Sequence, residues 1–332
     1  MQDEIVKFQI EDDKKFRILQ LTDIHYGAGF LSHKSDKLAE KAVRLIIEEA
    51  KPDLIICTGD LVYPIPIFSG SINNKKEFKK IGGIIDSYNI PWTICYGNHD
   101  VEPFALYNKS RISDFLITFK NSVFRRGPKD IDGQGNQIIK LYHKNTLALG
   151  LVLLDSNMYC QKGFFSGFDH IHDNQIDWYE QEILKLKEER ENVPTLMFFH
   201  IPCTEYKTAW REYTSGNKDN NVAYLFGEIG EINEYFGTPK IKSKIFDRVL
   251  ELGSTKGIFC GHDHLNTSVF RYKGVTLTYG MSIDFLAYKN ILKHSSQRGG
   301  TIIDIDKNGK FDISQIKLME LKGGYCNKNK YL

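Results

Sequence analysis

The 332-residue sequence is poor in the features that mark several protein classes. Its six cysteines form no C-x-x-C pair, its net charge is only +2, and no block of one charge sign stands out. These absences exclude a short-range disulfide framework and give no electrostatic case for nucleic acid or a membrane as partner. With 9 prolines, 27 glycines and 41% hydrophobic residues, the composition is that of a globular protein.

Long apolar segments are also missing. No window of 18 residues is free of charge, and the first eleven residues are polar. We therefore expect a soluble protein without a signal peptide or a membrane-spanning helix. Cys57, Cys95 and Cys260 lie inside apolar runs, where a thiol behaves as a small core side chain. Reduced, buried thiols favour a cytoplasmic location.

The sequence does contain β-rich apolar runs that alternate with helical patterns from end to end. Residues 16–57 predict a strand (16–21), a helix (37–50) and a second strand (53–57). Further strands are expected at 91–96, 137–142, 147–154, 196–199 and 257–260, helices at 74–88, from 173 or 174 and at 243–252, and hairpins at 268–279 and 301–316. This alternation predicts an α/β fold with sheet at its centre, and the lack of a linker predicts one domain over residues 1–332.

The longest segment without a periodic pattern is 203–239, which we interpret as an irregular insertion. A loop of that length inside a compact domain is usually functional or mobile. Trp210 and Arg211 near its start are candidates for substrate binding, with Arg211 pairing with an anionic oxygen. The alternative for both is packing.

Polar side chains follow five of the predicted strands. In an open α/β sheet, ligands gather outside the carboxyl ends of strands, so these side chains are expected to converge. Five of the ten histidines belong to the set. The strand-end residues are Asp23 and His25, Asp60, Asn98 and His99, His200, and finally His262 and His264.

As metal ligands, this set supplies two aspartates, one asparagine and four histidines, with His99 left over. That number of donors suits two ions, and a mixed imidazole and carboxylate shell suits Mn, Fe or Zn better than Ca or Mg. Two ions about 3.5 to 4 Å apart stabilise both ends of an in-line displacement at phosphorus and generate hydroxide from a bridging water. The reaction class is phosphoester hydrolysis.

The same residues form motifs that resemble those of the calcineurin-like metallophosphoesterases. They are Asp23-x-His25, Gly59-Asp60, Gly97-Asn98-His99-Asp100, His200 and Gly261-His262-x-His264, in the family's order. The resemblance implies a four-layer α/β/β/α sandwich of two mixed β-sheets flanked by helices. It assigns Asp23, His25, Asp60 and His264 to one metal and Asp60, Asn98, His200 and His262 to the other. His99 would face the leaving group as the acid.

The residues at two positions, 63 and 25, help to identify the branch of that family. Tyr63 stands where the serine/threonine protein phosphatases have Asp, which argues against them. Gly-Asp-x-x-Tyr is similar to the purple acid phosphatases, whose tyrosine binds ferric iron, but those enzymes have Gly at the position of His25. We expect Tyr63 beside the His25-side metal without dominating it. Asp100 either forms a hydrogen bond to the backbone of its own turn or forms one to a metal-ligating histidine.

Three functions therefore stand at the level of sequence. The first is a dinuclear metal-dependent phosphomonoesterase of the purple-acid-phosphatase-like branch. The second is a phosphodiesterase that uses the same metals on a diester or a cyclic nucleotide. The third is a catalytically inactive protein-binding scaffold, which the complete ligand set disfavours. The pair His170 and His172 could suggest another metal site, although solvated loop histidines are commoner.

Overall fold

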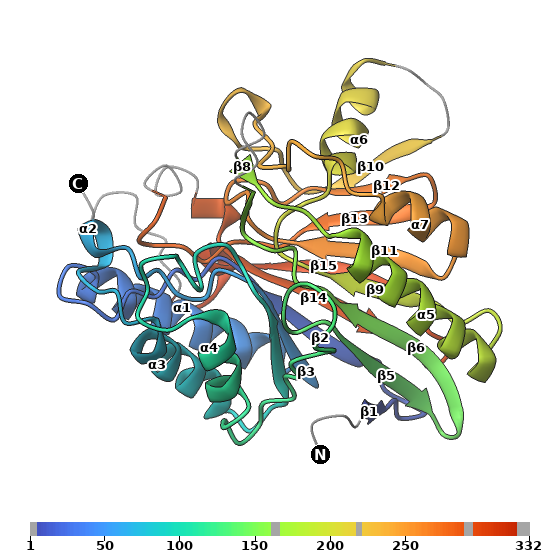
Figure 1. Cartoon of the computed structure of the whole chain (residues 1–332), viewed down its shortest axis with the longest axis horizontal. Coiled ribbons are helices and arrows are strands. Elements are labelled where there is room, and N and C mark those ends of the chain that lie inside the picture. The colour runs from blue at the N-terminus through green and yellow to red at the C-terminus, as the bar shows by residue number, and fades with distance from the viewer. Residues whose placement is uncertain (1–4, 161–166, 217–220, 289–294, 324–332) are drawn as a thin grey trace.

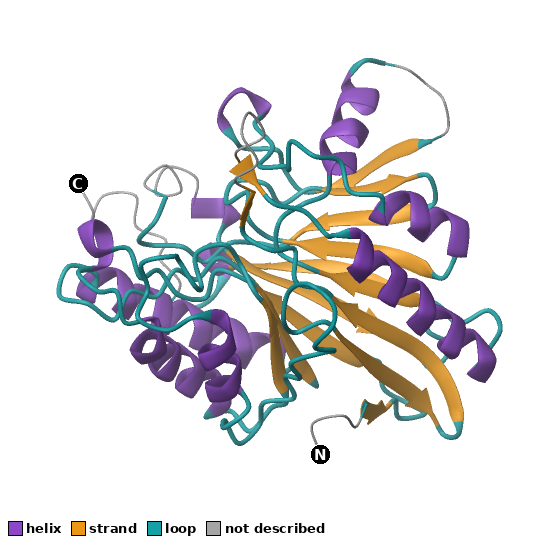
Figure 2. Ribbon diagram, in the orientation of Figure 1, coloured by secondary structure: helices purple, strands orange, loops and turns teal. Residues whose placement is uncertain are grey.

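Two β-sheets packed face to face form the centre of the computed structural model, which describes residues 5–160, 167–216, 221–288 and 295–323 (Figures 1 and 2). The larger sheet has eight strands in the order β1 (Val6–Gln9), β5 (Gln137–His143), β6 (Thr146–Leu153), β9 (Thr195–Phe198), β11 (Thr255–Cys260), β13 (Val275–Tyr279), β12 (Val269–Tyr272) and β10 (Val222–Phe226). The smaller has five, in the order β15 (Phe311–Lys317), β14 (Gly299–Ile305), β2 (Phe16–Leu21), β3 (Leu54–Thr58) and β4 (Trp92–Cys95).

Helices cover the outer face of each sheet. On the five-stranded sheet lie α1 (His33–Ala50), α3 (Asn74–Asp86) and α4 (Lys109–Leu116), with the short α2 (Pro66–Ser69) nearby. On the eight-stranded sheet lie α5 (Asp173–Glu189), α6 (Thr204–Thr214) and α7 (Ile245–Leu252). The layers therefore run helix, sheet, sheet, helix, as the family resemblance implied.

Three apolar cores separate the four layers. Along β2, Ile18 faces the core between the sheets and Leu19 faces the core under α1, because side chains of a strand alternate between its two faces. Strands buried on both faces need continuous apolar sequence, which is why these strands appear as unbroken hydrophobic runs. The predicted strands and helices therefore match the observed elements closely, apart from the insertion.

The segment 203–239 is more ordered than the sequence analysis predicted. Its first part is α6, and β10 pairs antiparallel with β12 to extend the eight-stranded sheet. Tyr206 is fully buried, and its hydroxyl donates to the carbonyl of Ile258. Polar residues between the buried positions of α6 hid this helical spacing, so the prediction of an irregular insertion is wrong for these residues.

Cysteine burial agrees with the sequence analysis. The five described cysteines are free and buried, while Cys326 lies outside the described residues.

Among the helices that the structure describes, none combines the length and apolar character needed to cross a membrane.

Parallel strands bring their carboxyl ends to one place in the fold. In the five-stranded sheet β2, β3 and β4 are parallel, and in the eight-stranded sheet β6, β9, β11 and β13 are parallel. A short two-stranded ribbon, β7 (Tyr159–Cys160) with β8 (Gly167–Phe168), lies outside both sheets. The polar residues that follow these strands are thereby gathered beside one another.

His172, at the start of α5, belongs to a separate cluster of ion pairs. Its Nδ1 lies 2.7 Å from an Asp132 oxygen and its Nε2 lies 3.1 Å from an Asp169 oxygen. Ligating atoms of Asp169, His170 and His172 lie within 4.8 Å of one another, as a metal site would require. Both ring nitrogens of His172 are nevertheless engaged by carboxylates, so we interpret the cluster as ion pairing that fixes the start of α5.

This ion pairing predicts a pH-dependent contribution to stability. Hydrogen bonding to Asp169 is the main cause that raises the pKa of His172 to about 9 from its ordinary 6.5. Because the folded pKa is raised, the stabilisation is fully present below pH 6.5 and is lost as pH rises through 9. His172→Ala should lower the free energy of unfolding by about 1 kcal/mol at pH 6 and by much less at pH 10. Urea unfolding at both pH values measures this, and an equal loss at both would contradict the ion-pair interpretation.

Candidate metal centre

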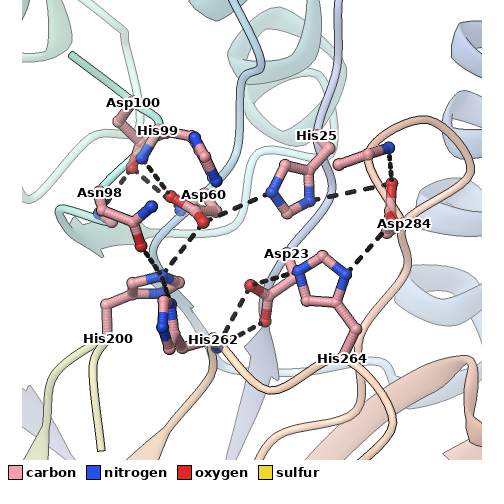
Figure 3. A network of polar contacts seen from close by, with 12 residues as sticks. Asp23, His25, Asp60, Asn98, His99, Asp100, His200, His262, His264 and Asp284 are labelled. Carbon is pink, nitrogen blue, oxygen red and sulfur yellow. Dashed lines mark hydrogen bonds and ion pairs between the residues drawn. The ribbon is translucent and has the colours of Figure 1, made fainter. Parts of the chain in front are cut away.

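Seven predicted ligands from both sheets meet at one point, with His99 beside them (Figure 3). Asp23 and His25 follow β2, Asp60 follows β3, and Asn98 follows β4. From the other sheet, His200 follows β9, and His262 and His264 follow β11. The structure therefore brings together residues that are far apart in sequence, as the strand-end pattern predicted.

The Asp60 carboxylate lies between two groups of ligands. Its Oδ2 is 3.4 Å from His25 Nε2 on one side and 3.1 Å from His200 Nε2 on the other. Its Oδ1 accepts the backbone N–H of His99 at 2.8 Å, which leaves Oδ2 as the shared atom. A single oxygen that faces both groups is the arrangement a bridging ligand requires.

The remaining donor atoms converge on the same two places. His200 Nε2 lies 3.2 Å from Asn98 Oδ1 and 3.3 Å from His262 Nδ1. On the other side, His264 Nε2 lies 3.5 Å from Asp23 Oδ1. Nδ1 of His200 donates to the carbonyl of Thr58 at 2.7 Å, and this fixes the tautomer in which Nε2 is available to a metal.

The ring of His25 is a test of whether metal ions fit this site. The side chain is fully buried, and neither ring nitrogen makes a hydrogen bond. Buried polar atoms are almost always satisfied, so two orphaned nitrogens call for a partner. An ion between His25, Asp23, Asp60 and His264 would satisfy Nε2, and the donor set suits Mn, Fe or Zn.

The backbone around the centre is strained. Asp23, His25, Asp60 and His262 have positive φ angles of 50°, 51°, 52° and 76°, a region that residues other than glycine seldom occupy. Backbone hydrogen bonds hold the strained turns together, with the N–H of His25 donating to the carbonyl of Asp60 at 3.0 Å. Strain of this kind persists where the surrounding structure imposes it, which is typical of functional sites.

Glycine allows two turns to approach Asp60 closely. A Cβ on Gly97 would lie 2.1 Å from Asp60 Oδ1, and a Cβ on Gly59, which has φ +87°, would lie 2.6 Å from His200 Nδ1. Neither position has room for a side chain. Gly97 therefore leaves space for the Asp60 carboxylate, and Gly59 leaves space for the His200 ring.

Asp100 holds the Asp60 turn by backbone hydrogen bonds. Its carboxylate accepts N–H groups from Asp60 at 3.0 Å, from Leu61 at 2.9 Å and from Gly97 at 2.8 Å. The bond to Gly97 is the local turn bond that the sequence suggested, while the others tie two loops together. Burial and the charge of Asp60 raise the pKa of Asp100 to about 7.

His99 is held by a residue that the sequence analysis missed. Its Nδ1 lies 2.6 Å from Glu102 Oε1, while the ring remains partly open to solvent. Tyr159 donates from its hydroxyl to the same glutamate oxygen at 3.1 Å and accepts from Asn98 Nδ2 at 3.0 Å. This chain fixes the His99 ring and turns the Asn98 amide so that Oδ1 faces His200. The spacing of Glu102, three residues after His99, was the available signal.

Asp284 is a second missed residue, and it lies behind the His25 side of the centre. Its carboxylate is 3.3 Å from His264 Nδ1 and 3.9 Å from His25 Nδ1, so it faces the nitrogens opposite the metal-facing ones (Figure 3). Backbone N–H groups of Leu286, Ala287 and Tyr288 donate to it at 2.7, 2.7 and 2.6 Å. Its position beyond the end of β13, a strand parallel to β11, was the signal in the sequence.

Tyr63 lies beside His25, as predicted. Its buried ring makes edge contacts with the rings of His25 and His99, each with centroids 5.0 Å apart. Burial raises the pKa of its phenol above the ordinary value. That Tyr63 borders the metal without dominating it stays a prediction.

Asp60 and His200 hold each other in charged form. Burial alone would lower the pKa of His200, but the Asp60 carboxylate raises it to about 10. Burial would raise the pKa of Asp60, but His200 and His99 hold it well below its ordinary value. Metal ions must therefore displace protons to bind, so their affinity is expected to fall at low pH.

The two substrate-binding candidates lie on α6. Trp210 packs against Phe270 with ring centroids 5.9 Å apart and donates from its indole to Glu234 at 2.8 Å, while Arg211 is exposed. The insertion reaches the centre through a different residue: the N–H of Gly237 donates to Asp263 at 2.9 Å, and a Cβ there would lie 2.5 Å from the His262 ring. A substrate role for Trp210 and Arg211 stays a prediction.

Comparison with known proteins adds a family and relatives. A model of the family described as calcineurin-like phosphoesterase matches residues 16–266. Two Arabidopsis thaliana proteins are similar over most of their length: probable inactive purple acid phosphatase 28 is 29% identical, covering 84% of this chain and 73% of the relative, and probable inactive purple acid phosphatase 29 is 26% identical, covering 92% and 80%.

A yeast protein and a solved structure extend this comparison. The phosphatase DCR2 of Saccharomyces cerevisiae is 29% identical over 80% of this chain and 46% of its own length. The crystal structure of a dimetal phosphatase from Danio rerio superposes with a TM-score of 0.57 at 11% identity, covering 91% of this chain and 96% of that one. At this identity the superposition supports the fold alone.

The contacts of Asp284 predict a selective effect on metal binding. Asp284→Ala should lower the affinity for the ion on the Asp23 side by about 10- to 100-fold, because the His25 and His264 rings lose the carboxylate that orients them. Calorimetric Mn²⁺ titration with metal analysis measures this. Asp36→Ala is the control, since Asp36 is a buried carboxylate that accepts from the N–H of Gly27 and the hydroxyl of Ser32. Equal loss of both ions, or an equal loss in the control, would contradict the orienting role.

Proposed function

The chain belongs to the calcineurin-like phosphoesterase family, and on this premise we propose that it is a dinuclear metal-dependent phosphomonoesterase. The observation that carries the proposal is the position of Asp60 Oδ2, which lies 3.4 Å from His25 Nε2 and 3.1 Å from His200 Nε2. One oxygen between two sets of donors fits two ions better than one. Family membership links such a centre to phosphoester hydrolysis.

The ligands divide into two groups that share Asp60. Asp23, His25 and His264 would hold one ion with it, and Asn98, His200 and His262 the other, with Mn, Fe or Zn as candidates. When bound, two such ions neutralise phosphoryl charge and activate a water for in-line attack. The protein's own contribution is to hold these donors in place, which Asp100, Asp284 and the Thr58 carbonyl support.

His99 is placed to donate a proton to the leaving oxygen. Glu102 engages Nδ1, so the proton available for transfer is the one on Nε2. Burial would lower the pKa of His99, but the charges of Asp60 and Glu102 raise it above the ordinary value, which favours the protonated acid. The partly exposed ring can then meet a substrate that approaches from solvent.

The alternatives are a phosphodiesterase and an inactive scaffold. A diester would use the same ions and the same acid. Two relatives are named probable inactive purple acid phosphatases, which favours the scaffold. Against it, every predicted ligand position of this chain carries a ligand-type side chain, and their donor atoms converge. The yeast relative is named a phosphatase.

Two aryl substrates separate these functions. We expect metal-loaded protein to hydrolyse p-nitrophenyl phosphate faster than bis-p-nitrophenyl phosphate when Mn, Fe or Zn is supplied in turn. Faster hydrolysis of the diester would support the phosphodiesterase. Two bound ions per chain without hydrolysis of either substrate would support the scaffold.

Replacing His99 should lower the rate of hydrolysis and leave metal binding unchanged. His99→Ala is expected to lose about two to four powers of ten in kcat on an alkyl phosphate, the range for a general acid. The loss should shrink on p-nitrophenyl phosphate, whose leaving group needs little protonation. Glu102→Gln should follow the same leaving-group trend with a smaller loss.

His143→Ala is the control for this series, since His143 pairs with Asp12 at 2.7 Å. Rates on a set of alkyl and aryl phosphates, with metal content measured on each variant, check the prediction. A loss in His99→Ala that is independent of the leaving group would show that His99 is not the acid.

A further inference from the structure

Six of the exposed apolar side chains lie on α2 and on the loops beside it. The most exposed are Phe30 at 79% and Ile67 at 76%, far above what a packed side chain retains. Exposed apolar patches mark sites where a protein meets a partner or a membrane. We name this set the apolar rim; its members are Phe30, Leu31, Ile67, Phe68, Ile72 and Leu106.

Backbone contacts join these segments into one surface. The N–H of Leu31 donates to the carbonyl of Ser69 at 3.2 Å, and the N–H of Leu106 donates to the carbonyl of Ile72 at 2.9 Å. A Cβ on Gly70 would lie 2.7 Å from the Phe30 ring, so that ring sits against the turn after α2. Figure 1 shows α2, α1 and α3 at the same end of the molecule.

Lysines dominate the exposed charge around the rim. Residues 28–37, 64–80 and 103–107 contain six lysines and two acidic residues. The acidic residues, Asp36 and Glu77, are buried at 5% and 0%, whereas five of the lysines are exposed. Three of these lysines line one hollow of about 310 Å³, together with Asp36 and the half-buried Glu40; they are Lys37, Lys76 and Lys80.

The rim also borders the metal centre. The Phe68 ring lies 5.9 Å from the Tyr63 ring, and the Tyr63 ring lies 5.0 Å from the His99 ring, centroid to centroid. Whatever contacts the rim is therefore next to the entrance that His99 faces.

We propose that the apolar rim and its lysines dock this face on an anionic phospholipid bilayer. Exposed apolar side chains beside lysines suit the boundary between lipid headgroups and acyl chains, whereas protein–protein interfaces are depleted in lysine. Lysines beside them would meet the negative surface, and the two contributions together give stable peripheral binding. The linear sequence predicts no membrane partner because these lysines lie in two separate segments, 28–37 and 64–80, and only the fold brings the segments together.

Vesicle sedimentation tests the proposal with the full chain. We expect binding to phosphatidylcholine vesicles that contain roughly 30% phosphatidylserine to be about tenfold stronger than binding to pure phosphatidylcholine vesicles. Raising the salt from about 0.1 M to about 0.5 M should weaken it, because exposed charges are screened. No binding to the anionic vesicles at low salt would overturn the proposal.

Matched variants locate the docking surface. Phe30→Ser with Ile67→Ser should reduce affinity for anionic vesicles about tenfold, and so should Lys34→Gln, Lys37→Gln and Lys80→Gln together. Leu184→Ser with Leu225→Ser is the apolar control, with side chains 49% and 41% exposed elsewhere. Lys256→Gln, Lys273→Gln and Lys310→Gln together form the charge control, since each of these lysines is exposed.

Two results would assign the surface differently. Equal losses of vesicle affinity in the rim variants and in their controls would show that the apolar rim is not the docking surface. A dimer in sedimentation velocity that Phe30→Ser with Ile67→Ser abolishes, without vesicle binding by the wild type, would assign the rim to a second copy of the chain. Thermal unfolding of every variant confirms that it is folded, so the outcome depends on binding alone and is independent of catalysis.

Discussion

The rest of the site depends on the burial of one carboxylate among histidines. Asp60 is 1% exposed, and its Oδ2 faces nitrogens of His25 and His200 that come from different sheets. A buried charge is costly unless opposite charge compensates it. The fold therefore creates a place where positive charge is required, and protons or metal ions can supply it.

Holding that carboxylate constrains the backbone around it. Four non-glycine residues in the centre adopt positive φ, and Gly59 and Gly97 leave no room for a side chain near Asp60. Asp100 and Asp284 fix the turns and rings from behind through backbone N–H groups. Contacts within the protein thus hold the donors in place, which reduces the reorganisation that ion binding requires.

The two sides of the centre have different chemical character. Toward the sheets, ligands and supporting carboxylates are buried and bonded. Toward solvent, His99 is partly open, and Tyr63 and Phe68 lead outward to exposed apolar loops. A phosphoryl group would meet the polar floor while the rest of a substrate would meet this outer surface. The metal centre and this outer surface therefore present different chemistry to a molecule that contacts both.

The sequence by itself determined the strands, most helices and the residues of the centre. Strands buried on both faces must be continuously apolar, so polar residues at their ends stand out, as Asp23, Asp60 and His200 do. Only the tertiary structure decided which residues support them from a distance. Asp284 faces His264 from another strand end, and Tyr159 reaches Asn98 from a ribbon outside the sheets. The helix α6 lies in the segment that the sequence predicted to be irregular. Such contacts depend on side-chain directions across non-local pairings, which local periodicity does not encode.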